Sequence, residues 1–308
     1  MKHKALIALA LSLCLSTGVV RATDDIRSRL VVDSTWLASQ LDDPKLVILH
    51  VGDPDDYAKG HIPGARLVTL DDLSVSEHTK NGLMLEMPAD DELRTRLQKL
   101  GISDDSRIIV YYAKDWVSPA TRIVFTMQYA GLGERTSLLD GGMKAWVRQG
   151  HSLSKAAASA APGTLAPLKT EPLIVDAAYV REHVGTPGVS VVDGRAAVYY
   201  DGVDTGGAHG QVHKTGHIKG AHSIPFTELA NDTLLIRSQD ELKAIFDKAG
   251  VKPGDTVVGY CHVGQQATAT LFAARLLGHP VKLYDKSFQD WSRGADNAVE
   301  TAAARGRP

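Results

Sequence analysis

"DTVVGYCHVGQQATATLFAARLLGH", Asp255 to His279, opens with a short apolar run that stops at Cys261. Six short or polar residues follow, and the remainder carries apolar residues at helical spacing. A continuous apolar run of this length is typical of a strand buried on both faces of a parallel sheet, and the next helix covers one face. The stretch therefore predicts an α/β domain with a thiol at the tip of a central strand.

Much of the chain is present twice. The segment DDYAKGHIPGARLVTLDDL, residues 55–73, returns as VHKTGHIKGAHSIPFTEL, residues 212–229. Further on, SLLDGGMKAWVRQG in the first copy matches KLYDKSFQDWSRG in the second, and the offset between matched positions stays nearly constant. We interpret the chain as a tandem duplication of one α/β domain, each copy a parallel sheet with helices on both faces.

The copies set the domain boundaries. Residues 23–153 form the first domain and 173–297 the second, and the Ala-, Ser- and Pro-rich stretch 154–172 reads as a linker. Residues 298–308 are expected to be a frayed tail. In the second copy, periodicity predicts helices over Ala177–His183, Gln239–Ala249, Ala267–Leu277 and Phe288–Trp291, and strands at VSVVDG, into Ser223, at DTVVGY and at PVKLYD.

The amino-terminal stretch MKHKALIALALSLCLSTGVVRA, residues 1–22, predicts a secretory signal cleaved after Ala22. A membrane anchor is the alternative, but the apolar run is too short to span a bilayer comfortably. We therefore expect a periplasmic or secreted protein with no membrane partner after cleavage. The formal net charge of −2 and 23% charged residues give no indication of nucleic acid as a partner.

Cleavage would leave Cys261 as the only thiol, because the other cysteine is Cys14. A buried, inert cysteine is one interpretation. Its place between a strand and a helix favours another, because loop N–H groups and the helix dipole stabilise an anion there. We expect the thiol pKa to fall into the range of about 3.5 to 7.5 seen in reactive cysteines. A protonated His262 would add charge, or it is a solvated loop residue.

Two reaction classes use a thiolate held in such a loop. Phosphatases of the phosphotyrosine type need an arginine after five intervening residues, and here that position is Ala267. The other class transfers a sulfane sulfur: the thiolate attacks a donor, becomes a persulfide and passes the outer sulfur to a nucleophile. Loop N–H groups suit this chemistry because both sulfur anions need stabilisation.

The chain resembles the tandem-domain rhodaneses, which include thiosulfate and 3-mercaptopyruvate sulfurtransferases. The resemblance covers about residues 30–295 and is carried by a set of motifs in order: GHIPGA (60–65), LDGGMKAW (139–146), VVDGR (191–195), GHIKGA (216–221), YCHVGQQA (260–267) and YDKSFQDW (284–291). It implies that Cys261 is the persulfide-forming nucleophile. The active-site loop that holds its substrate would comprise His262, Val263, Gly264, Gln265 and Gln266.

The resemblance also matches Asp193 and Arg195 to the aspartate and arginine beside that loop, where a structural ion pair that orders the loop is the alternative to a catalytic role. In the first copy, alignment of Tyr112 with Tyr260 puts Ala113 opposite Cys261, and His50 and Gly52 stand opposite Asp193 and Arg195. The first domain is therefore expected to be catalytically inactive and to wall one side of the cleft. Three of its residues are candidates to face that cleft: Lys114, Asp115 and Trp116.

The sulfur donor is left open between thiosulfate and 3-mercaptopyruvate, because His262 and Val263 match neither subgroup of the family. Thiosulfate is favoured because an exported protein would not meet a cytosolic metabolite. Tyr199 and HGQVHK occupy the region where mercaptopyruvate-specific members carry arginines, and Lys286 and Arg237 are candidate replacement cations. The acceptor would be a thiophile such as cyanide or a thiol.

No cofactor or metal is expected. His209, His213 and His217 recur every fourth residue, but Gly206, Gly207, Gly210 and Gly216 disfavour the helix that would gather them. Two other functions stay open: a persulfide carrier that delivers sulfur to a protein client, and a periplasmic solute-binding protein. Two complementary domains make a monomer sufficient.

Overall fold

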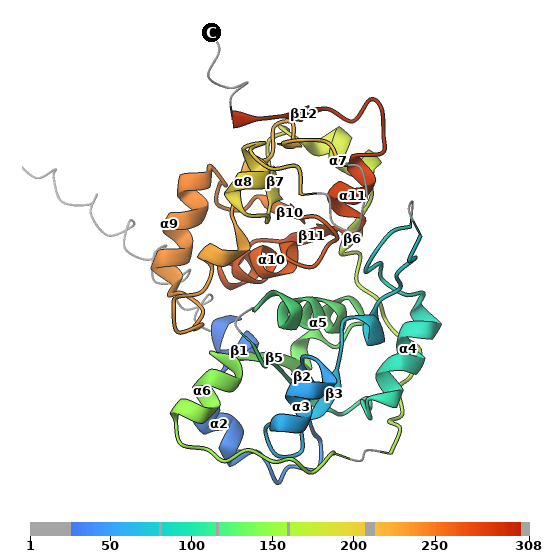
Figure 1. The fold of residues 1–308 in the computed structure, drawn as a ribbon, viewed down its shortest axis with the longest axis vertical. Helices are drawn as coiled ribbons and strands as arrows, with labels where there is room; N and C mark the ends of the chain where they lie inside the picture. The colour runs from blue at the N-terminus through green and yellow to red at the C-terminus, as the bar shows by residue number, and fades with distance from the viewer. Residues whose placement is uncertain (1–25, 80–81, 115–116, 159–160, 207–212, 303–308) are drawn as a thin grey trace, which may run out of the picture.

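The computed structural model describes residues 26–79, 82–114, 117–158, 161–206 and 213–302. The predicted signal sequence of residues 1–22 lies outside them, as do Asp115, Trp116 and His209. The described residues form two parallel five-stranded sheets, stacked one domain above the other in Figure 1. The α/β class and the tandem repeat are confirmed.

Both sheets have the same strand order. The first runs β1 (Val31–Val32), β5 (Thr136–Leu139), β4 (Arg107–Tyr112), β2 (Leu46–Val51), β3 (Arg66–Val68). The second runs β6 (Ile174–Val175), β11 (Val281–Tyr284), β10 (Thr256–Tyr260), β7 (Val189–Asp193), β9 (His222–Ser223). The central strands β4 and β10 are almost wholly buried because helices cover both faces.

Helices connect the strands in both copies. The first contains α2 (Ser34–Ser39), α3 (Pro54–Lys59), α4 (Asp90–Lys99), α5 (Ser118–Tyr129) and α6 (Gly142–Arg148). The second contains α7 (Ala177–His183), α8 (Ala197–Tyr200), α9 (Gln239–Ala249), α10 (Ala267–Leu276) and α11 (Ser287–Trp291). Single 3-10 turns lie at Asp71–Leu73, Gly133–Arg135 and Phe226–Glu228. The helices expected from the sequence of the second copy are present within one residue at each end.

Local sequence explains where these helices begin. Asp33, Asp53 and Asp176 cap α2, α3 and α7 through side-chain oxygens that accept backbone N–H groups. Ser238 and Glu241 form a reciprocal capping box at the start of α9. Each cap therefore fixes the residue at which the loop ends and the helix begins.

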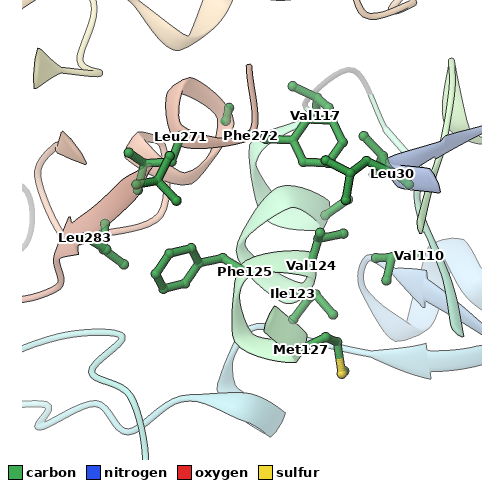
Figure 2. Packing of buried hydrophobic residues seen from close by; sticks show 14 of the residues in the cluster. Leu30, Val110, Val117, Ile123, Val124, Phe125, Met127, Leu271, Phe272 and Leu283 are labelled. Atoms are coloured by element: carbon green, nitrogen blue, oxygen red, sulfur yellow. The ribbon is translucent and has the colours of Figure 1, made fainter. Parts of the chain in front are cut away.

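One hydrophobic cluster joins the two domains. Helices α5 and α10 lie side by side at the centre of the molecule, and their apolar residues belong to the same buried cluster. Figure 2 shows Phe125 of α5 projecting toward Leu271 and Leu283 of the second domain, with Phe272 near Val117. A shared core of this kind favours domains that move as one body.

The tail and the linker are more ordered than the sequence indicates. Val299–Glu300 form β12, which pairs antiparallel with β8 (His217–Ile218), so the expectation of a frayed tail is wrong for these residues. In the linker, Ser154 bridges to His61 and Leu165 is buried. No helix among the described residues is long and apolar enough to cross a membrane.

Candidate active site

Cys261 lies directly after β10, in the loop that leads into α10. Its side chain is fully buried, and the Cys261 N–H donates to Ser287 Oγ at 3.2 Å. The carbonyls of Cys261 and His262 accept the N–H groups of Phe288 at 3.0 Å and Gln289 at 3.1 Å. The start of α11 therefore packs against the backbone of Cys261 and His262.

The backbone N–H groups of Ala267, Val263 and Gln266 favour the ionised form of Cys261 and lower its pKa. Such loop donors are what the sequence predicts. Burial nevertheless outweighs them and raises the pKa of the Cys261 thiol. The expectation of a lowered pKa is therefore wrong, because the desolvation of a fully buried thiol exceeds what the loop donors supply.

Asp193 and Arg195 form a fully buried ion pair beside the loop. Arg195 Nη2 donates to Asp193 Oδ2 and to the Gly216 carbonyl, each at 2.7 Å, and its Nε contacts the same carboxylate. The guanidinium lies 4.1 Å from the centre of the Phe288 ring. Arg195 Nη1 has no hydrogen-bond partner among the described residues. The pair is therefore held in place by Gly216 and Phe288 and leaves one cationic donor unused.

The rim of the site is aromatic and neutral. The rings of His262 and Tyr199 meet edge to face at 4.7 Å, and His213 lies 6.0 Å from His262. Burial, followed by the charge of Arg195, lowers the pKa of His262 to about 4 and also lowers that of His213. His262 therefore adds no positive charge at neutral pH. The His213 side chain is buried, and its ring meets that of Phe288 edge to face.

The remaining sequence candidates have other partners. Lys114 pairs with Asp53 and Asp56 in the first domain, and Arg237 pairs with Glu241. Lys286 lines a cavity with Glu86. His217 bonds the Tyr200 carbonyl and Glu300, as a structural histidine would. Among the residues that the structure describes, no group of His, Cys, Asp and Glu is arranged to hold a metal ion.

Strand register corrects the comparison of the two copies. His50 pairs with Tyr111 as Asp193 pairs with Tyr260. The hydroxyls of both tyrosines accept an N–H from the GHIxGA motif that precedes them in the same copy. Tyr111 is therefore the equivalent of Tyr260, and Tyr112, rather than Ala113, stands where the second copy has Cys261. The first copy has two adjacent tyrosines, Tyr111 and Tyr112, and aligning the second of them with Tyr260 caused the one-residue error.

Sequence reasoning missed Ser287, Arg122 and Asp285. Ser287 holds a left-handed φ of 53° and supplies the oxygen that accepts the Cys261 N–H. Arg122 reaches from α5 to Asp285 and to the Gly264 carbonyl. The sequence did contain one indication of the Arg122 contact: a lone arginine interrupts the apolar pattern of TRIVFTM.

Comparison with known proteins agrees with this geometry. Residues 33–149 and 176–294 each match the family described as rhodanese-like domain. The chain belongs to the rhodanese family. It is 31% identical over 282 residues to the 3-mercaptopyruvate sulfurtransferase of Escherichia coli K12, covering 87% of this chain and 97% of that protein.

Other rhodanese relatives cover similar spans. The thiosulfate sulfurtransferase of Azotobacter vinelandii is 27% identical over 280 residues, covering 90% of this chain and 99% of that protein. The wild-type structure of EanB superposes with a TM-score of 0.78 at 25% identity, covering 91% of this chain and 70% of that chain. This rhodanese is a sulfurtransferase that acts between sulfur donors and acceptors.

Proposed function

We propose that this rhodanese carries a sulfane sulfur as a persulfide on Cys261, and that only the second domain performs the chemistry. The observation that carries the proposal is the fully buried Cys261 directly after β10, where the backbone N–H groups of Ala267, Val263 and Gln266 favour its thiolate. The first domain has Tyr112 at that position and Gly52 where the second has Arg195. It retains no thiol among the described residues.

The transfer has two steps. The Cys261 thiolate attacks the outer sulfur of thiosulfate, a new S–S bond forms, the donor's S–S bond breaks, and sulfite leaves with its electron pair. A thiophile such as cyanide then attacks the outer sulfur, leaves as thiocyanate, and returns the bonding pair to Cys261. Both sulfur anions lie where loop N–H groups stabilise developing charge.

Arg195 gives the site its anion preference. Its Nη1 is the unused donor of a guanidinium that Asp193 already holds in place, so an incoming anion meets a preorganised fork. One such cation beside neutral His262 suits a donor with a single negative group, while the expected export favours thiosulfate. The proposal therefore keeps thiosulfate and 3-mercaptopyruvate as donors, with a small thiophile or a protein thiol as acceptor.

Mass spectrometry of the intact protein tests the cycle. We expect one sulfur atom to add at Cys261 with either donor and to be removed by cyanide. Because burial raises the thiol pKa, loading should accelerate as the pH is raised above neutrality. The ratio of kcat/KM for the two donors identifies the preferred one.

Matched variants sharpen that test. Cys261→Ser should fold and lose sulfur transfer by at least about a thousandfold. The double variant with Tyr112→Cys should recover no activity, because Gly52 leaves the first domain without the equivalent of Arg195. Sulfur transfer by the serine variant would refute the persulfide.

We also propose that the protein is exported and cleaved after Ala22. Amino-terminal sequencing of the protein from its host checks this directly: a chain that begins at Thr23 in the periplasmic or secreted fraction is the expected result. A cell-associated chain that retains residues 1–22 would contradict it.

A further inference from the structure

A buried arginine of the first domain reaches the active-site loop of the second. Arg122 projects from α5, is 2% exposed, and donates from Nη1 to Asp285 Oδ1 at 2.5 Å and to the Gly264 carbonyl at 3.2 Å. Its Nη2 donates to the Leu85 carbonyl at 2.6 Å. The first domain also braces Asp285 from the other side, because the Met87 N–H donates to its Oδ2 at 2.8 Å.

The contact with Gly264 fixes a peptide of the loop. In a trans peptide the carbonyl and the N–H of the next residue point in opposite directions. With the Gly264 carbonyl turned toward Arg122, the Gln265 N–H points away from Arg122. Gly264 has a φ of 80°, and a Cβ there would lie 2.6 Å from the Asp285 carbonyl, so the loop sits directly against the ion pair.

The other half of the molecule lacks this arrangement. Thr121 of α5 meets Thr268 of α10 across the interface, and the glycines just beyond the two helices, Gly131 and Gly278, keep the same spacing from them, so Ala269 stands where α5 has Arg122. Asp140 follows β5 as Asp285 follows β11. Asp140 accepts the Ile236 N–H, which mirrors the contact of Met87 with Asp285. The repeated interface therefore carries an alanine on the side of the first domain's strand ends and an arginine on the side of the Cys261 loop.

We propose that Arg122 is a positioning residue of the sulfur-transfer site, which holds the Gly264 peptide so that the Gln265 N–H faces the outer sulfur of the persulfide. The inactive first domain thereby supplies part of the active-site geometry. Gln265 and Thr268 add further contacts to the same helix, through Ser118 at 3.1 Å and Thr121 at 3.0 Å. This inference rests on the proposed persulfide of Cys261.

Three variants of the full chain test the proposal. Arg122→Leu removes the hydrogen bonds of the guanidinium and keeps an apolar side chain at this buried position. Arg122→Lys keeps a cation for Asp285 but loses the fork that spans several acceptors. Tyr112→Phe is the matched control, because the Tyr112 hydroxyl donates to the Leu234 carbonyl across the interface at 2.6 Å without reaching the loop.

Two readouts separate positioning from plain stability. The first is the pH midpoint for alkylation of Cys261 by iodoacetamide, followed on the Cys261 peptide by mass spectrometry. The second is kcat/KM for thiosulfate with cyanide. We expect Arg122→Leu to raise the midpoint and to lower kcat/KM by on the order of 10²-fold, as misplacement of loop groups does. Arg122→Lys should lower kcat/KM about tenfold and should also raise the pH midpoint for alkylation.

Tyr112→Phe should lower only the midpoint of urea unfolding. The proposal is overturned if Arg122→Leu leaves both readouts unchanged, or if Tyr112→Phe shifts them equally. If Arg122→Leu does not fold, the lysine variant decides by the same comparison. A wild-type protein that never gains sulfur would defeat the proposed function instead, while the alkylation midpoint would still decide whether Arg122 acts on the loop.

Discussion

Ser287 adopts a backbone conformation that costs a non-glycine residue about 1 to 2 kcal/mol. The equivalent residue of the first copy is Gly142, with a φ of 51°, so the turn itself requires this geometry. Ser287 accepts the Cys261 N–H and donates to the Tyr284 carbonyl at 2.9 Å. Strain retained at a buried site with these contacts indicates that the hydroxyl is needed to hold the cysteine backbone.

Glycine at position 287 should therefore lower the unfolding free energy less than alanine does. Ser287→Ala keeps the strained φ and leaves the Cys261 N–H without an acceptor, which should cost about 2 to 3 kcal/mol of unfolding free energy. Ser287→Gly loses the same hydroxyl but relieves the strain, so it should cost about 1 kcal/mol less than the alanine variant. Urea unfolding measures both. An alanine variant at least as stable as the glycine variant would contradict this account.

Among the elements, the loop from β10 to α10 depends on Gly264. A side chain there meets the Asp285 carbonyl at 2.6 Å, besides the cost of a φ of 80°. We expect Gly264→Ala to displace the loop, to lower the unfolding free energy by more than about 2 kcal/mol, and to reduce sulfur transfer on the order of 10²-fold. Denaturation and steady-state kinetics measure the two effects.

Gly254 provides the matched control. It has a φ of 84° in the turn before β10, with open space where a Cβ would lie. Gly254→Ala should cost only the backbone strain, about 1 kcal/mol, and leave transfer unchanged. Equal losses of activity in the two variants would show that the loop is not sensitive to its contact with Asp285.

The strands and helices of the second copy followed from sequence because apolar runs and caps act locally. The sequence could also bring Cys261 and the pair of Asp193 and Arg195 to the same edge of the sheet, because Asp193 ends β7 and Cys261 directly follows the neighbouring strand β10. Arg122 and Ser287 were not found. Their roles depend on partners 142 and 26 residues away in the chain, Gly264 and Cys261, and no local pattern encodes such a contact. The thiol pKa was misjudged because burial is a property of the packed molecule.

At the scale of the whole molecule, the two domains share a hydrophobic core and a set of polar contacts across their interface, which we call the seam. Arg122, Asp285 and Met87 bridge it on the catalytic side, and Gln289 bonds both backbone groups of Met84 at 3.0 Å. These contacts are buried and connect to the active-site loop. Conditions that weaken the seam should therefore reduce stability and sulfur transfer together.

Glu86 makes the seam sensitive to pH. It lines a cavity of about 530 Å³ between the domains with Asp285 and Lys286. Burial, followed by the charge of Asp285, raises the pKa of Glu86 to about 7. The folded state thus binds a proton that the unfolded chain releases near pH 4.5, so the stabilisation is complete below that pH and is lost as the pH rises through about 7.

We expect the unfolding free energy of the wild type to fall by about 1 to 2 kcal/mol between pH 6 and pH 8, after allowance for the partial exposure of Glu86. Glu86→Gln should remove this slope and be the more stable protein at pH 8, because glutamine mimics the protonated acid. Glu182→Gln, in which an exposed glutamate of α7 is replaced, changes the net charge equally and should keep the slope. Urea unfolding at each pH measures all three. A slope that survives in Glu86→Gln, or disappears in Glu182→Gln, would assign it to general charge rather than to the seam.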